Sequence, residues 1–224
     1  MPIKIIAQPA VEPVTLAEAK LHLRVDIADD DPLITTLIGA ARVAAENICR
    51  RAFVTQQWTL FMDAFPRQNF YGVLPGYAPL DQFIPSVMQA QRGYAIRFRG
   101  GKIELPFPSL QSVQSIQYRD ITGALVTMDP SLYTVDNASE PGVLTPAPGQ
   151  FWPDTQNIMN AVQISYTAGY GTPAQVPSGI KSWMLLRIGA LYENREEVAV
   201  GPRIVVLELP FVDGLLDPYV IGTF

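Results

Sequence analysis

The sequence predicts an α+β fold, in which a small helical bundle carries a β-sandwich-like subdomain inserted between its second and a later helix, followed by an extended C-terminal tail. Apolar residues recur at helical spacing as far as residue 51, short alternating runs follow to residue 175, and helical spacing returns from residue 176. We therefore expect a helical part over residues 1–51, a β subdomain over 52–175 with a long loop at 66–94, a helix over 176–204 that completes the bundle, and a tail over 205–224.

A capping pattern marks the start of the first helix. Thr15 can accept a hydrogen bond from the first turn, and Glu18, three residues later, can reach back to the Thr15 amide. Leu16, Ala19 and Leu23 then share one helical face. These residues predict a short amphipathic helix.

The second helix follows three consecutive aspartates. Pro32 suits a first turn because its missing N–H would be unpaired there, and carboxylates favour the positive end of the helix dipole, so we expect Asp31 to be the cap. The predicted helix runs to about Arg51. Glu46 lies four residues before Arg50, which predicts a weak surface ion pair. The apolar stripe of this helix comprises Leu33, Ile34, Leu37, Ile38, Ala41, Ala44, Ala45 and Ile48.

Short alternating runs predict a β subdomain of sandwich or barrel type. After a first strand near residues 54–62, strands are expected at Ala95–Phe98, Lys102–Leu105, Val113–Tyr118, Ala124–Met128, Leu132–Val135, Gly142–Leu144 and Ala161–Thr167. The aromatic, Pro-rich and Gly-rich stretch before Tyr94 has no clean period. It predicts a long loop that becomes ordered against a neighbour.

A last helix is predicted by apolar residues on one face after Val176. These residues are Ile180, Met184, Ile188 and Leu191. We expect this helix to pack against the first two.

Composition restricts the class of protein. Apolar residues make up 48% of the chain and charged residues only 17%, which indicates surface that is hidden against partners. The net charge of -5 argues against a protein that wraps nucleic acid, because such binding relies on Lys and Arg. Arg187 interrupts the most apolar helical run, and the N-terminus does not resemble a signal peptide, so we expect a soluble protein without a membrane span.

Motifs that carry chemistry are weak in this chain. His22 and Cys49 are single residues of their kind, which favours neither a metal site nor His-based catalysis, and Cys49 is expected to be buried. The acidic run before Pro32 resembles the start of a calcium loop but lacks its central Gly and closing Glu. Gly169 and Gly171 lack the third glycine of a dinucleotide fingerprint and predict a turn. We predict no catalytic residue, no metal and no cofactor.

The two N-terminal helices also invite a helix-turn-helix interpretation. We reject it because Asp30 and Asp31 would meet the DNA phosphates with like charge.

Arg97 and Arg99 lie on the same face of a predicted strand. Their side chains form either a solvated face or an electrostatic contact with an acidic neighbouring subunit or with passing DNA.

Several motifs in order resemble the head-tail connector proteins of tailed phages, also called adaptor or head-completion proteins. They are PVTLAEAKLHLRVD, DDDPLITTLIGAAR, WTLFMDAFP, LPFPSLQSVQSIQYRD, TAGYG and VPSGIKSWMLLRIGALYENRE. The resemblance implies a structural virion protein without catalytic residues, assembled in the host cytoplasm into a ring, typically dodecameric, in the neck between head and tail. Such a ring joins the portal to the tail or neck protein below and extends the DNA channel, and DNA passes without sequence-specific binding.

The resemblance directs attention to two sets of contact residues. The small residues Gly39 and Ala40 permit another helix to approach closely. Glycine within a helix lowers stability by about 1 kcal/mol relative to alanine, which indicates that Gly39 is kept for packing. Candidates for the subunit interface are therefore Gly39 and Ala40, together with Arg97 and Arg99. The alternating apolar residues of the tail could add a strand to a sheet edge of the portal. They are Val205, Leu207 and Leu209, followed by Phe211.

A rival hypothesis is a small-molecule or carbohydrate-binding β module. Aromatic residues between Phe70 and Tyr94 support it.

Overall fold

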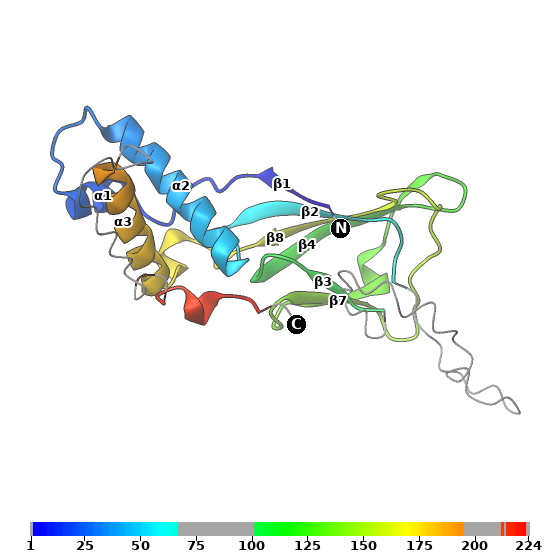
Figure 1. Ribbon diagram of the computed structural model, residues 1–224. Coiled ribbons are helices and arrows are strands. Elements are labelled where there is room, and N and C mark those ends of the chain that lie inside the picture. The colour runs from blue at the N-terminus through cyan, green and yellow to red at the C-terminus, as the bar shows by residue number, and fades with distance from the viewer. Residues whose placement is uncertain (1, 67–100, 195–211, 213, 223–224) are drawn as a thin grey trace, which may run out of the picture.

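The computed structural model describes residues 2–66, 101–194, 212 and 214–222. Helices form one end of the molecule and two antiparallel sheets form the other (Figure 1). The α+β class is therefore confirmed. The helices are α1 (Leu16–Leu23), α2 (Asp31–Cys49) and α3 (Ser178–Glu193).

The strands divide into a five-stranded and a three-stranded sheet. The first sheet has the order β1 (Ile3–Ala7), β2 (Gln56–Met62), β8 (Val162–Ala168), β4 (Leu110–Arg119) and β5 (Leu125–Thr127). The second has the order β3 (Ile103–Leu105), β7 (Gly142–Pro146) and β6 (Tyr133–Asp136). The predicted strands between residues 102 and 167 are thus confirmed with shifted ends, whereas the one predicted at Ala95–Phe98 lies outside the described residues.

Strand β1 was not predicted. It contains five residues and lies at the edge of its sheet, where it pairs antiparallel with β2, more than fifty residues away in the sequence. A five-residue segment shows little periodicity, so only the partner strand makes it recognisable.

Helix α1 forms as its capping pattern predicts. The Glu18 amide donates to Thr15 Oγ1 at 3.2 Å, and the Thr15 amide donates to Glu18 Oε2 at 2.7 Å. The Thr15 amide and hydroxyl both donate to the Glu18 carboxylate, and these two bonds hold the pKa of Glu18 below its usual value. Arg24 ends the helix in the left-handed conformation, with φ of 58°. The capping box is therefore confirmed in both directions.

Helix α2 begins one residue earlier than predicted, and Asp31 is not its cap. The cap position belongs to Asp30, and Asp31 lies in the first turn, where its carboxylate accepts from Lys20 Nζ at 2.6 Å. Lys20 also donates to the Ile27 carbonyl at 2.9 Å. The α1 lysine therefore holds both the connecting loop and the Asp31 side chain, and a local capping rule could not predict this contact.

Two apolar cores support the two ends of the molecule. The helical core contains side chains from all three helices, which are Ala19, Ile34, Ile38, Ala41, Ala45, Cys49, Ile180, Trp183, Met184 and Ile188. The second core takes side chains from both sheets, which are Leu60, Met62, Ile103, Leu105, Leu110, Ile116, Leu144, Val162, Ile164 and Tyr166. A fully buried Leu or Ile side chain contributes roughly 1.5–3 kcal/mol, so each core is a substantial source of stability.

The described part of the C-terminal tail is not extended away from the protein. Leu216 is buried in the helical core, and Tyr219 packs against it. The Ile221 amide donates to the Cys49 carbonyl at 3.0 Å, and Gly179 leaves room for the Tyr219 ring. The prediction of a wholly extended tail is wrong for residues 214–222, because apolar side chains of this segment pack against the helical core of the same chain.

The turn after β8 gives a test of the fold. Gly169 has φ of 126°, and a Cβ there would lie closer to the Val54 backbone than real Cβ atoms do. We expect Gly169→Ala to lower the free energy of unfolding by about 3 kcal/mol or more, measured by urea denaturation. Gly149 also has positive φ but nothing within 4 Å of its added Cβ, so Gly149→Ala should cost only about 1 kcal/mol. Equal losses for both variants would contradict the close approach.

Candidate functional site

An ion pair between a buried arginine and a partly exposed glutamate joins the helical end to the sheets. Arg51, just after α2, is a buried residue with 5% of its surface exposed. Its Nη1 and Nη2 donate to the two carboxylate oxygens of Glu140, both at 2.7 Å, and its Nε donates to the Tyr219 carbonyl at 3.3 Å. Ser109 also donates to Glu140, and the guanidinium lies 5.3 Å from the centre of the Tyr170 ring. One side chain therefore holds α2, the residues before β4 and β7, and the C-terminal segment.

The arginine controls the titration of its partner. The hydrogen bonds and charge of Arg51 hold the pKa of Glu140 below its usual value, although partial burial opposes them. This ion pair was not predicted, because its members are 89 positions apart in the sequence. Nothing in the local pattern around either residue indicates it.

A second polar network lies between α2 and the start of the β subdomain. Arg42 donates to Glu46 at 2.7 Å and to Glu12 at 2.8 Å. Glu46 also accepts from the Phe53 amide at 2.9 Å and from the side chain of Gln56. Burial raises the pKa of Glu46, and the hydrogen bonds only partly offset this effect.

The predicted surface pair of Glu46 with Arg50 is therefore wrong. Glu46 is buried and points toward the chain reversal after α2, where the Phe53 amide needs an acceptor. Arg50 ends the helix in the left-handed conformation with φ of 54°. A buried amide without an acceptor costs more free energy than the few tenths of a kcal/mol that a surface ion pair contributes, so Glu46 bonds the Phe53 amide.

The residues with potential chemistry do not come together. Cys49 is buried as predicted, and burial raises the pKa of its thiol to about 11, so it is not a thiolate at neutral pH. His22 is exposed on α1, beside Gly189 of α3. Within residues 2–66, 101–194, 212 and 214–222, no group of three or more His, Cys, Asp or Glu could hold a metal ion. The charged groups described above hold the backbone in place.

The outer face of α2 carries the first two candidate interface residues. Ala40 is exposed and Gly39 partly exposed, and a Cβ at Gly39 would meet only Glu12, at 3.8 Å. Packing within the chain therefore does not require glycine there. Val43, one turn further along, is 45% exposed. The exposed residues within α2 are all uncharged, namely Pro32, Thr35, Thr36, Ala40, Val43, Asn47 and Ile48.

The remaining candidate contact residues have no described geometry. Arg97, Arg99, Val205, Leu207, Leu209 and Phe211 lie outside the described residues. Their roles stay predictions.

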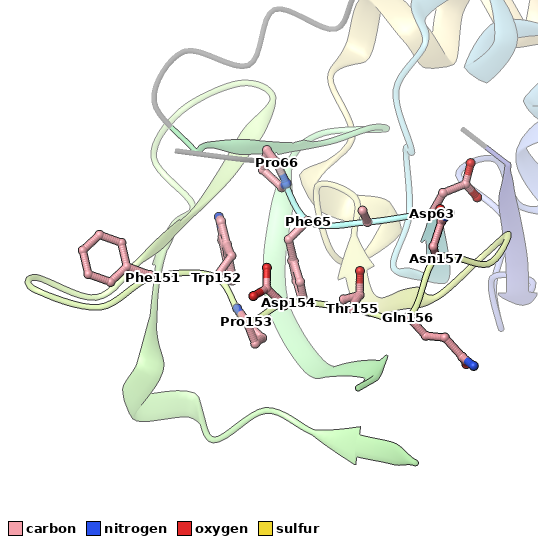
Figure 2. Close-up of a pocket in the computed structure, with 11 residues that line it drawn as sticks. Asp63, Phe65, Pro66, Phe151, Trp152, Pro153, Asp154, Thr155, Gln156 and Asn157 are labelled. Atoms are coloured by element: carbon pink, nitrogen blue, oxygen red, sulfur yellow. The ribbon is translucent and has the colours of Figure 1, made fainter. Parts of the chain in front are cut away.

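A pocket of about 630 Å³ is lined by residues 63–66, which follow β2, and by residues 151–157. In Figure 1 these two stretches of chain lie at the end of the sheets away from the helices. Two stretches of chain, residues 63–66 and 151–157, face each other across it, as Figure 2 shows. The Trp152 ring stacks on Phe65 with 4.9 Å between ring centres, and Trp152 Nε1 donates to the Gly101 carbonyl at 2.5 Å. The sequence did not predict this pocket, because its two sides are almost ninety residues apart.

The described helices and antiparallel sheets define a protein of the α+β class, and comparison with known families refines this description. Residues 13–83 match the family described as phage gp6-like head-tail connector protein. This match includes α1, α2 and β2. It confirms the resemblance to head-tail connector proteins that the sequence motifs indicated.

Solved structures of similar fold cover the whole chain. A chain from the neck of an empty GTA particle computed with C6 symmetry matches with a TM-score of 0.71 and 18% identity, over 100% of this chain and 97% of that one. A chain from the virion of a native gene transfer agent (GTA) particle matches with a TM-score of 0.70, and one from the neck of a native GTA particle computed with C12 symmetry with 0.66. Both are 17% identical and have the same coverage. No curated protein sequence matches the chain.

None of the helices in the described ranges is long and apolar enough to cross a membrane.

The ion pair of Arg51 and Glu140 can be tested by its dependence on pH. Glu140→Gln leaves a buried guanidinium without its counter-charge, so we expect the free energy of unfolding to fall by about 2 kcal/mol near pH 7. The fall should be smaller than for a fully buried ion pair, because the Glu140 side chain is 41% exposed. The folded-state pKa of Glu140 lies below its usual value of 4.5. Its contribution is therefore present above pH 4.5 and disappears as the pH falls through the lower, folded-state value.

Urea denaturation of the wild type and of Glu140→Gln across this pH range measures the effect. Glu104, exposed on β3, supplies a control, because Glu104→Gln should change stability little at any pH. A difference between wild type and Glu140→Gln that stays constant down to pH 3 would show that charge is not the source of the stabilisation.

Proposed function

We propose that this protein is a structural connector of a virion neck. Copies form a ring that joins the capsid portal to the tail or neck protein below and extends the DNA channel. The observation that carries this proposal is the family match at residues 13–83 together with a fold shared over the full chain with GTA neck and virion chains. In this role the protein needs no catalytic residue or cofactor, and it resides in the virion neck after assembly in the host cytoplasm.

A ring of copies, most simply twelve, is supported by the symmetry under which the similar necks were computed. Those structures were computed with C6 and C12 symmetry. The subunit would comprise the four parts expected from the sequence, with the two sheets as a sandwich-like subdomain. Their shared apolar core supports that arrangement.

The acidic charge of the chain suits a channel through which DNA slides. The net charge is -5, and strong binding of phosphates by Lys and Arg would slow the passage of DNA. DNA therefore passes without sequence-specific contacts.

The outer face of α2 is the proposed contact between neighbouring subunits. Gly39 and Ala40 allow close approach of another chain, and exposed Val43 adds apolar surface. Arg97 and Arg99 are the proposed electrostatic part of the same interface. An exposed helix face without charge is unusual for a helix that stays in water.

The proposed portal contact consists of Val205, Leu207, Leu209 and Phe211. The chain that follows them is anchored, since Leu216 and Tyr219 pack on the helical core. The rival β-module hypothesis rests on aromatic residues outside the described part of the chain, and the full-length fold match favours the connector.

Electron microscopy of the protein mixed with its portal tests the proposal. We expect closed rings seated on the portal.

Deleting the tail is a poor test of the portal contact, because it also removes Leu216 from the core. Val205→Ser, Leu207→Ser and Leu209→Ser combined should instead abolish portal binding without unfolding the protein. Ile121→Ser with Leu125→Ser, at exposed positions near and on β5, is the matched control and should bind normally. Failure of the wild type to form rings with the portal would refute the proposal.

Gly39→Ala separates assembly from stability. Alanine in a helix interior is favoured over glycine, and the added Cβ has room within the chain, so the free energy of unfolding of the isolated protein should rise by about 0.5–1 kcal/mol. Ring formation on the portal should fall, because the methyl group holds the neighbouring chain away. Thermal denaturation and microscopy measure the two effects. A more stable variant that assembles normally would remove Gly39 from the interface.

A further inference from the structure

The five-stranded sheet has a second face, opposite to the apolar core that it shares with the other sheet. Side chains on this polar sheet face alternate along each strand with the core residues and pair across the strands, as Thr59 does with Ser165. The middle of the polar sheet face is formed by Gln57, Thr59, Gln114, Gln117, Gln163 and Ser165. Its surface is therefore made mainly of hydroxyl and amide groups.

The polar sheet face contains no carboxylate. None of the strands β1, β2, β8, β4 and β5 includes Asp or Glu, although the chain has 21 acidic residues. The charged residues of these strands are Lys4 and Arg119, and both alternate with core residues. Asp63 and Asp120 follow the ends of β2 and β4, where each accepts a hydrogen bond from a backbone amide at 2.8 Å. The polar sheet face is thus weakly positive in a chain of net charge -5.

Hydrogen bonds between strands hold this surface in place. The hydroxyl groups of Thr59 and Ser165 are 3.1 Å apart, and the Gln114 amide donates to the Thr167 hydroxyl. Thr59 is only 5% exposed, whereas Gln57 and Gln114 are exposed. The surface that a partner would meet consequently consists of glutamine amides above a fixed layer of hydroxyl groups.

This chemistry fits the backbone of DNA better than it fits a protein. The centres of protein interfaces are rich in aromatic and apolar side chains, and the aromatic ring on the polar sheet face is that of Phe61, which lies under Lys4. Ser, Thr and Gln side chains, in contrast, commonly contact the phosphates and sugars of DNA. Because the strands contribute no carboxylate, a phosphate near this face meets no like charge.

We propose that the polar sheet face is turned toward the DNA that passes through the ring. This inference rests on the proposed connector, and it names the surface that lines the channel. Contacts of Lys and Arg with phosphate are the main source of tight, salt-dependent DNA binding. Lys4 and Arg119 offer few such contacts, since Arg119 also donates to the Gly123 carbonyl at 2.9 Å. DNA at this face meets neither repulsion nor a strong grip, so it can slide.

Photocrosslinking in DNA-filled particles tests which surface meets the DNA. The full-length protein carries Gln57→p-benzoylphenylalanine or Gln114→p-benzoylphenylalanine, because both side chains are exposed on the polar sheet face. After irradiation we expect protein–DNA adducts that nuclease treatment removes.

Two other positions serve as controls for the crosslinking. The same replacement at Glu104, exposed on β3 of the other sheet, should give no DNA adduct. At Val43, on the outer face of α2, it should give adducts between protein chains. Particles that contain the protein but give no DNA adduct from Gln57 or Gln114 refute only this inference. Particles that lack the protein refute the connector, and this inference with it.

Added positive charge gives a second test. Gln57→Lys with Gln114→Lys introduces new phosphate contacts in every subunit, and such contacts weaken as salt rises. We expect DNA release from particles to become several times slower at low salt and to approach the wild-type rate at high salt. Thr134→Lys with Gln150→Lys adds the same charge at exposed positions outside the polar sheet face and should release DNA normally. Equal release rates for the two lysine variants would contradict the proposal.

Discussion

The buried guanidinium of Arg51 is the constraint on which the arrangement of the two ends depends. It lies where the chain leaves α2 for the sheets, within a run in which Ala52 belongs to the β core and Phe53 to the helical core. A buried cation is tolerated only with a counter-charge, so Glu140 must come to this point and bring the residues before β7 with it. The same guanidinium holds the Tyr219 carbonyl, which ties the end of the chain to the junction. These contacts fix the position of the helices relative to the sheets.

The two polar networks at the junction respond to pH in opposite directions. Arg51 lowers the pKa of Glu140, whereas burial raises the pKa of Glu46. As the pH rises, Glu140 adds to stability when it ionises, while ionised Glu46 carries a desolvation cost that its hydrogen bonds from Arg42 and the Phe53 amide reduce. Removal of Glu140 leaves the buried Arg51 charge behind, and removal of Arg42 leaves the buried Glu46 carboxylate. Both networks are therefore better suited to fixing geometry than to adding stability.

The surface that the fold leaves open is divided by charge. The exposed residues of α2 are uncharged, and the charged residues that line the pocket at the other end of the sheets are both aspartates. A protein that works as a monomer in water usually has charged residues spread over its surface. In the proposed ring each subunit would meet its two neighbours through two different surfaces.

The sequence by itself determined the features that depend on neighbours along the chain. The Thr15–Glu18 capping box, the apolar stripe of α2, the strands after residue 102 and the buried Cys49 all follow from spacing, because helical and strand periods place nearby residues on one face. Family motifs added the connector resemblance. Only the tertiary structure decided the pairing of β1 with β2, the turn of Glu46 toward the interior, the Arg51–Glu140 pair, the docking of Leu216 and the acidic pocket. Each joins positions whose contact depends on how the whole chain folds, and the free energy of burial, rather than local propensity, selects it.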